Sequence, residues 1–85
     1  MGEIVALLLT DVVDSTLTTQ RLGDKRALAL WTEHDRRARD LLRRHHGREI
    51  DRADGFLLMF DTAANAACYA LDYHAALAGL GLAAW

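Results

Sequence analysis

The segment from Arg48 to Phe60 constrains the fold most, because it carries the signature of a β-hairpin. Asp54-Gly55 is typical of tight hairpin turns, and it lies between two runs of strand length, Arg48 to Arg52 and Phe56 to Phe60. The second run, Phe-Leu-Leu-Met-Phe, is apolar throughout, as in a strand that lies inside a sheet. The sequence therefore predicts an antiparallel pair whose second strand is an interior strand.

The residues before the hairpin predict one strand and two helices. The apolar run from Ile4 to Thr10 is typical of a strand that is buried on both faces. Ser15-Thr16 can cap a short helix that ends near Gly23. Asp24 can cap a longer helix, which Gly47 ends. The apolar positions of this helix follow the i, i+3, i+4, i+7 spacing: Ala27, Leu28, Trp31, Ala38, Leu41 and Leu42.

The residues after the hairpin predict a last helix, which completes the order of elements. Asp61 or Thr62 can cap this helix, which extends to about Ala78 and carries alanine and leucine at helical spacing. The order is then β-α-α-β-β-α. This order predicts an α+β fold, a ferredoxin-like arrangement in which helices pack on an antiparallel sheet.

The C-terminal residues suggest a larger domain. A ferredoxin-like unit has a further strand after its last helix, so either the apolar Leu82 to Trp85 begins that strand or the chain is part of a larger domain. We favour the second and expect residues 1–85 to be the N-terminal part of a larger domain. The sheet of such a part would have an exposed edge, which favours self-association.

Composition excludes several classes of protein. The formal net charge of −2 gives no overall attraction to nucleic acid or to anionic lipid. Cys68 is the single cysteine, so no internal disulfide can form, and this suits a reducing compartment. No apolar run approaches the length that spans a membrane, and Ile4 to Leu9 is too short for a secretory signal. We expect a cytoplasmic protein without nucleic-acid partners or membrane insertion.

Two carboxylates, Asp11 and Asp54, are candidates for a functional site. Asp11 ends the first strand and Asp54 lies in the hairpin turn, so one antiparallel sheet can bring both to the same end. Carboxylates bind Mg²⁺, and the amides at a helix N-terminus bind phosphate oxygens. Each aspartate also has a structural explanation, as a helix cap or a turn former. Spacing alone therefore does not decide between these roles.

Two separated motifs resemble the first half of the catalytic domain of class III nucleotidyl cyclases, the adenylate/guanylate cyclase family. The first is LLLTDVVDSTLTTQRLGD, residues 7–24, and the second is HHGREIDRADGFLLMF, residues 45–60. The family pattern is roughly F-T-D-x-x-G-S-T on the first strand and G-D-G-F at the hairpin turn. The resemblance covers nearly all of the chain, with the motifs in the family's order.

The resemblance implies a two-metal site and a nucleotide substrate. Asp11 and Asp54 would be the metal aspartates of two Mg²⁺ or Mn²⁺ ions, with the carbonyl of Val12 as a further ligand. The amides of Val13, Asp14, Ser15 and Thr16 would bind the β- and γ-phosphates. The reaction would form cAMP and pyrophosphate from ATP, in intracellular signalling, and the active protein would be a homodimer through this domain.

Three positions depart from the family pattern. Asp14 and Ala53 replace glycines, and Ile50 or Asp51 lies where the family has its base-selecting lysine, so the choice between ATP and GTP cannot be read. These departures leave two alternatives open. One is a catalytically decayed module that senses nucleotides or dimerises, and the other is a ferredoxin-like interaction domain whose aspartates only shape turns.

The remaining polar and aromatic residues are given structural interpretations. The arginines from Arg36 to Arg44 are interrupted by acids, which predicts a solvated helix face with ion pairs. His34 and His74 have no partners at useful spacing and are predicted at the surface or its boundary. Cys68 is predicted to be a small core residue. Tyr69 and Tyr73 form a patch, either for internal packing or for a partner subunit.

Overall fold

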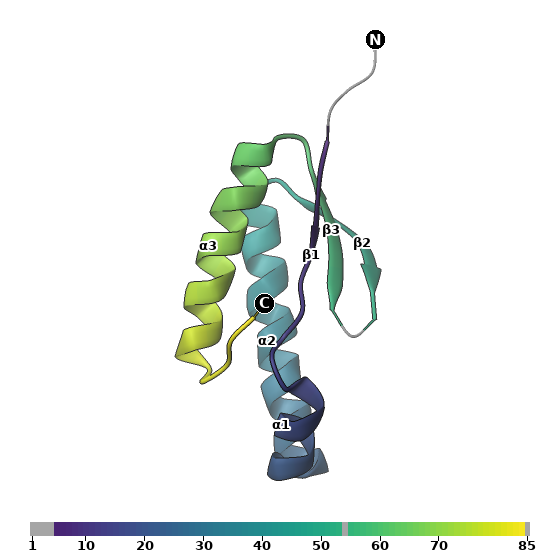
Figure 1. The fold of residues 1–85 in the computed structure, drawn as a ribbon, viewed down its shortest axis with the longest axis vertical. Coiled ribbons are helices and arrows are strands. Elements are labelled where there is room, and N and C mark those ends of the chain that lie inside the picture. Colours follow the sequence, from purple (N-terminus) through teal and green to yellow (C-terminus); the bar gives the residue numbers. More distant parts are fainter. Residues whose placement is uncertain (1–4, 54, 85) are drawn as a thin grey trace.

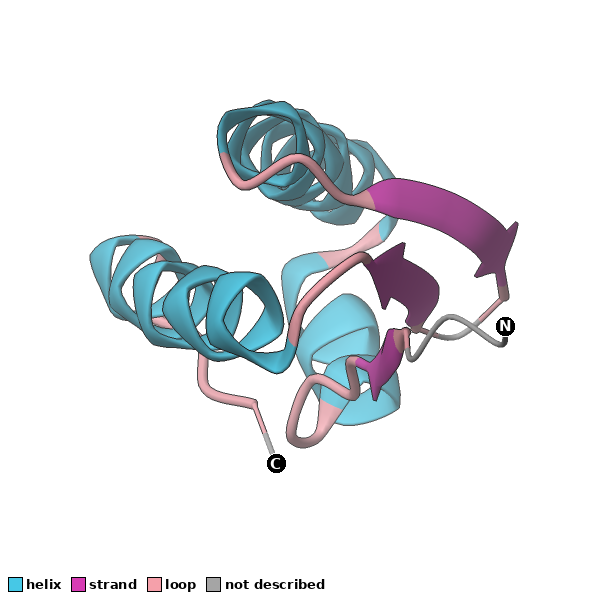
Figure 2. Ribbon diagram, turned by 90° about the horizontal axis from the view of Figure 1, so that it is seen from above, coloured by secondary structure: helices cyan, strands magenta, loops and turns pink. Residues whose placement is uncertain are grey.

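A computed structural model describes residues 5–53 and 55–84 of the chain (Figure 1). Its elements follow the predicted order: β1 (Ala6–Leu9), α1 (Ser15–Leu22), α2 (Asp24–Arg44), β2 (Arg48–Arg52), β3 (Phe56–Phe60) and α3 (Ala63–Gly79). The strands form one antiparallel sheet in the order β1-β3-β2. Helices α2 and α3 pack side by side on one face of this sheet (Figure 2). The predicted α+β fold is therefore confirmed.

Strand β3 is the central strand, as the sequence predicted. Phe56, Leu58 and Phe60 point into the core with relative exposures of 1%, 1% and 0%, while Leu57 and Met59 are half-buried on the other face. The bounds of both hairpin strands are those expected from the sequence. The hairpin signal was sufficient here because turn type and strand pairing are local properties.

The prediction for the first strand is wrong in one respect. Strand β1 lies at an edge of the sheet, and Leu7 and Leu9 are 64% and 71% exposed. Its alternate residues Ala6 and Leu8 pack against the core. Successive side chains of a strand point to opposite faces, and within the described residues no helix covers the face that carries Leu7 and Leu9.

The buried stripe of α2 differs from the prediction at two positions. Leu28 is 70% exposed, whereas His34, predicted near the surface, is 3% exposed. The stripe runs through Ala27, Trp31, His34 and Ala38, with steps of three and four residues, and on to Leu41 and Leu42. Leu28 is adjacent to Ala27 and therefore lies about 100° away around the helix.

Helix α3 buries its tyrosines. Tyr69 and Tyr73 are 0% and 3% exposed, so both pack internally, and their rings stack with centroids 5.8 Å apart. Cys68 is exposed, contrary to the prediction, because it is adjacent to Tyr69 and points away from the buried stripe. The helix is capped by Thr62, whose Oγ1 accepts a hydrogen bond from the backbone N–H of Asn65 at 3.1 Å.

The first two helices begin differently from the prediction. Helix α1 is preceded by Asp14 and α2 by Gly23, and neither helix has a side-chain cap. Ser15-Thr16 and Asp24 are the first residues of their helices rather than caps. Asp24 is still favourably placed, since an acid in the first turn interacts with the positive end of the helix dipole.

The charged face of α2 carries ion pairs, as predicted. Arg36 pairs with Glu33 and Asp40, and Arg37 Nε lies 2.8 Å from Glu33 Oε1. Hydrogen bonds from Arg36 and Arg37 lower the pKa of Glu33 to about 2. Within the described residues, none of the helices combines the length and the apolar character needed to cross a membrane.

Candidate functional site

The pairing of β1 with β3 determines which residues lie at the proposed site. The two strands are antiparallel, with Leu9 opposite Leu57. Beyond this pair, the N–H of Thr10 donates to the carbonyl of Phe56 at 2.9 Å, and the N–H of Phe56 donates to Thr10 Oγ1 at 2.8 Å. The end of β1 therefore meets the hairpin turn, so Asp11 lies at the same edge of the sheet as the turn.

Asp54 lies outside the described residues, but both of its neighbours are described. Ala53 and Gly55 line a cavity of about 380 Å³ together with Asp11 and Asp51. Gly55 packs directly on the first strand. A Cβ at this position would overlap the carbonyl oxygen of Thr10 and would lie 2.8 Å from its carbonyl carbon. This contact explains why the hairpin motif needs a glycine after its aspartate.

The residues around this cavity fit a divalent cation with oxygen ligands. Asp11 and Asp51 are both among the residues that line it, and carboxylate oxygens are the ligands that Mg²⁺ and Mn²⁺ prefer. Asp51 was not assigned to the metal from the sequence; its position at the end of β2, beside the turn, was the available signal. Among the described residues alone, no group of three His, Cys, Asp or Glu side chains is arranged to hold a metal.

The loop between β1 and α1 leads into the N-terminus of α1. Asp11, Val12, Asp14, Ser15 and Thr16 contribute to the lining of a cavity of about 480 Å³. The first amides of a helix have no intrahelical acceptor, so those of Ser15 and Thr16 can donate to an anion. The amide of Val13 is different, because it donates to the carbonyl of Ala83 at 2.8 Å.

Asp14 has a left-handed backbone conformation, with φ 55° and ψ 36°. Glycine adopts this conformation freely, and aspartate is one of the few other residues that visit it routinely. Asp14 therefore has a backbone conformation that glycine would adopt as well. It also adds a carboxylate to the lining of the cavity beside the helix N-terminus.

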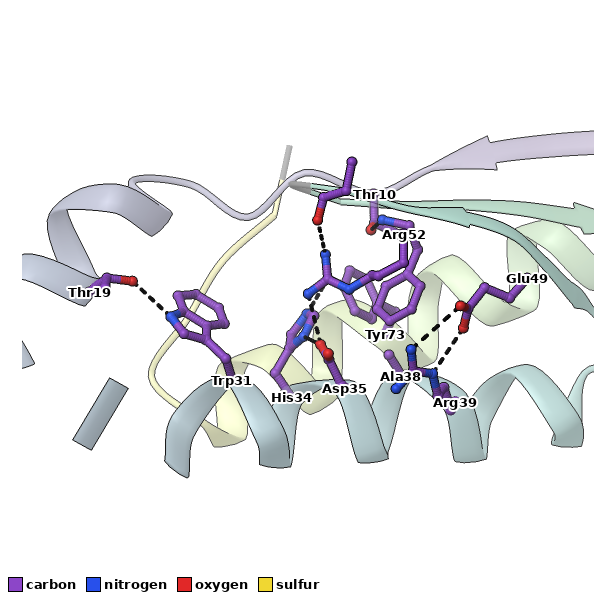
Figure 3. Close-up of polar contacts among 12 residues, drawn as sticks. Thr10, Thr19, Trp31, His34, Asp35, Ala38, Arg39, Glu49, Arg52 and Tyr73 are labelled. Atoms are coloured by element: carbon purple, nitrogen blue, oxygen red, sulfur yellow. Dashed lines mark hydrogen bonds and ion pairs between the residues drawn. The ribbon is translucent and has the colours of Figure 1, made fainter. Parts of the chain in front are cut away.

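A buried polar network, which sequence reasoning missed, connects the helices to the hairpin (Figure 3). The Nε2 of His34 lies 2.7 Å from the hydroxyl of Tyr73, and its Nδ1 lies 2.8 Å from Asp35 Oδ1. Arg52 donates to the same Asp35 oxygen at 2.9 Å and to the carbonyl of Ala53 at 2.7 Å. The position of His34 on the apolar stripe of α2 was the signal in the sequence.

The network changes the pKa values of two of its members. Burial alone would raise the pKa of Asp35, but the hydrogen bonds from His34 and Arg52 outweigh it, so the pKa is lowered. Burial raises the pKa of the Tyr73 hydroxyl. Asp35 is therefore a carboxylate and Tyr73 a neutral phenol at neutral pH, which suits a fixed structural network.

A third cavity, of about 330 Å³, lies between α1, α2 and the end of β2. Trp31 closes it toward α1, where the indole Nε1–H donates to Thr19 Oγ1 at 2.8 Å. His34, Arg52 and Ala53 also line it, so it shares residues with the polar network. The network thus lies directly behind the phosphate-binding loop that the resemblance implies.

Comparisons with known proteins find similarity in structure. A scan against protein-family models gave no match, and a search of curated proteins gave none either. Two solved structures of adenylate cyclases from Trypanosoma brucei in their monomeric state are similar. One has a TM-score of 0.76 and 24% identity, and the match covers 86% of this chain and 31% of that chain. The other has a TM-score of 0.75 and 26% identity, with 86% and 32% covered.

The chain thus has the fold of part of an adenylate cyclase. It spans about a third of the length of each similar structure. The resemblance that the two motifs predicted is confirmed by this similarity. The assignments of Asp11, Val12 and Asp54 to metal, and of Val13 to Thr16 to phosphates, stay predictions.

Proposed function

We propose that this chain is the metal- and triphosphate-binding part of a nucleotidyl cyclase that converts ATP to cAMP and pyrophosphate. The observation that carries the proposal is the pairing of the end of β1 with the start of β3, which places Asp11 at the hairpin edge. The structural similarity to adenylate cyclases supports it independently. A cyclase of this kind would act in cytoplasmic signalling.

The proposed metal ligands are Asp11, Asp54 and the carbonyl of Val12. Two bound Mg²⁺ or Mn²⁺ ions would supply activation of the ribose 3′-oxygen and neutralise charge at the α-phosphate. The chain itself contributes the Asp11 carboxylate just beyond the end of β1, where pairing with β3 holds the strand in place. The Asp11 side chain is exposed, so substrate and metal can reach it from solvent.

The triphosphate would bind at the start of α1. The helix dipole and the amides of Ser15 and Thr16 favour negatively charged oxygens there. Asp14 also belongs to this proposed site and contributes its amide, while its carboxylate raises the need for a neutralising cation. Val13 can contribute its amide only after releasing the carbonyl of Ala83.

A second copy of the domain is the proposed partner. The face of the sheet opposite the helices carries Leu7 and Leu9, which are 64% and 71% exposed. Exposed apolar area of this kind favours association between protein surfaces. We expect sedimentation at micromolar concentration to show self-association of the chain, and a monomer would contradict this part of the proposal.

Metal binding by the chain itself tests the proposed site. We expect Mn²⁺ titration, followed by the electron paramagnetic resonance signal of the free ion, to show weak binding that Asp11→Asn and Asp54→Asn both reduce. Asp61→Asn is the matched control, because Asp61 follows β3 at the far end of the hairpin and pairs with Arg48 at 3.3 Å. Equal binding by all variants would remove the metal assignment.

Catalysis is tested in the protein extended to a full cyclase domain. ATP and Mn²⁺ should yield cyclic product, detected by mass spectrometry, and Asp54→Ala should lose it. Since positioning and electrostatics supply most of the rate in phosphoryl transfer, the loss should be severe. Equal product from both proteins would refute the metal role of Asp54.

One observation favours a second candidate, a decayed module that binds nucleotide without converting it. The carboxylate of Asp14 is exposed at the cavity where the phosphates would lie, and repulsion there opposes a productive triphosphate position. This alternative would be established if the extended protein binds ATP but neither the wild type nor Asp14→Gly forms cyclic product.

A further inference from the structure

We propose that Arg52 is a positioning residue that fixes the hairpin turn and thereby sets the affinity of the site for a divalent cation. This role rests on the proposed function, since it concerns the placement of a turn that carries a proposed metal ligand. The observations behind it are contacts of described residues on both sides of position 54.

The Arg52 side chain connects the turn to a helix through two separate hydrogen bonds. Its Nη1 donates to the carbonyl of Ala53 at 2.7 Å, and its Nη2 donates to Asp35 Oδ1 at 2.9 Å. The guanidinium carbon lies 4.4 Å from the centroid of the Phe56 ring. A planar guanidinium held at these three points leaves the carbonyl of Ala53 little freedom.

Asp35 is itself held in place by His34, its neighbour in α2. His34 Nδ1 lies 2.8 Å from Asp35 Oδ1, and His34 Nε2 lies 2.7 Å from the Tyr73 hydroxyl. The imidazole is 3% exposed and is in contact with the rings of Trp31, Phe56 and Tyr73. Asp35, the half-buried anchor of Arg52, is therefore held by a fully buried histidine, whose side chain has few alternative positions.

The two sides of the hairpin turn differ in the contacts that hold them. On the β3 side, Gly55 packs against the backbone of Thr10, and Phe56 is hydrogen-bonded to it. On the β2 side, the register shifts between Glu49 and Asp51, so Ile50 is an extra residue in the strand. Such a bulge interrupts the regular ladder and re-aims the residues after it. Asp51 and Arg52 then pair with Leu57 and Phe56, and the Arg52 side chain adds a constraint on the Ala53 carbonyl that this pairing does not provide.

Metal affinity is sensitive to groups that orient the ligands. Removal of such an outer partner typically costs 10- to 100-fold in affinity. Arg52→Lys is the informative variant, because it keeps the positive charge but replaces the planar guanidinium, whose two terminal nitrogens bond Ala53 and Asp35, with a single ammonium nitrogen. A change in metal affinity would then report geometry rather than charge.

Arg39→Lys is the matched control. Arg39 is the second guanidinium over the same Phe56 ring, at 5.3 Å, and its Nε donates to Glu49 at 2.9 Å. It makes no hydrogen bond to the turn among the described residues. Both variants thus exchange a ring-stacked, paired arginine for lysine, and only one of them releases the hairpin turn.

The experiment compares three measurements on this chain: Mn²⁺ titration, amide hydrogen exchange without metal, and thermal unfolding. Arg52→Lys should weaken Mn²⁺ binding about tenfold. It should also speed exchange of the Ala53 amide, which donates to the carbonyl of Gly55 at 3.0 Å. Arg39→Lys should leave both readouts within twofold of the wild type.

If Arg52→Lys does not fold, Tyr73→Phe replaces it and should weaken Mn²⁺ binding about threefold, since it removes one hydrogen bond from the far end of the network.

The possible outcomes separate this inference from the function it rests on. The positioning role alone is overturned if Asp11→Asn reduces Mn²⁺ binding but Arg52→Lys, or Tyr73→Phe in its place, binds Mn²⁺ within twofold of the wild type. A lower unfolding temperature with unchanged Mn²⁺ affinity also overturns that role, because a merely structural residue behaves in that way. Equal Mn²⁺ binding by the wild type and Asp11→Asn refutes the proposed function, and with it this inference.

Discussion

Gly55→Ala is the substitution whose consequence the structure defines most sharply. The added methyl group would overlap the carbonyl oxygen of Thr10 and lie 2.8 Å from its carbonyl carbon. Both atoms belong to the backbone of Thr10, directly after β1, so no flexible side chain can move aside. The end of β1 must therefore separate from the start of β3.

The expected cost follows from the contacts at that point. Two hydrogen bonds join Thr10 and Phe56, at 2.9 and 2.8 Å, and each contributes about 1 kcal/mol net. Overpacking of a well-packed position adds about 1–3 kcal/mol. We expect the free energy of unfolding to fall by about 3–5 kcal/mol, a large part of the 5–15 kcal/mol typical of a domain.

Urea unfolding followed by far-ultraviolet circular dichroism measures this cost, with Gly79→Ala as the control. Gly79 lies in α3, where a Cβ would meet only Arg37 Nη1 at 3.5 Å, an ordinary contact. Alanine also favours the helix, so this control should be as stable as the wild type or more stable by up to about 1 kcal/mol. If the free energy of unfolding of Gly55→Ala lies within about 1 kcal/mol of that of the control, the steric reasoning is refuted.

Three further predictions concern the loop and the buried network. Asp14→Ala should lower the free energy of unfolding by about 1 kcal/mol, because alanine is strained at φ 55°, whereas Asp14→Gly should cost less; urea unfolding compares the two. Because the pKa of Asp35 is lowered in the folded state, its carboxylate stabilises the fold above about pH 4, and this contribution is lost as the pH falls below that value. Asp35→Asn should therefore make the free energy of unfolding depend less on pH between pH 2 and 6. The raised pKa of Tyr73 means that its neutral form stabilises the fold below about pH 10 and that stability falls as the pH rises further; Tyr73→Phe should reduce this loss between pH 10 and 12, and an unchanged alkaline transition would contradict it.

The elements and their order can be read from local patterns in the sequence. The Asp-Gly turn, the apolar run from Phe56 to Phe60 and the periodicity of α2 are local patterns, and local hydrogen bonding and one-sided burial are enough to read them. Asp11 could also be recognised from the sequence as a candidate site residue, because it directly follows the apolar run that predicts the first strand. The edge of the sheet where Asp11 lies then followed from antiparallel pairing.

The side chains that meet across elements could not be read from these local patterns. His34 and Asp35 are adjacent in sequence, yet one is buried against Tyr73 and the other accepts hydrogen bonds from Arg52, contacts that span 39 and 17 residues. Exposure of Leu28 and Cys68 was likewise decided by the rotation of each helix about its axis, which depends on packing against neighbours. Periodicity specifies that a helix has a buried face, but contacts between distant residues fix the orientation of that face and which polar groups are buried with it.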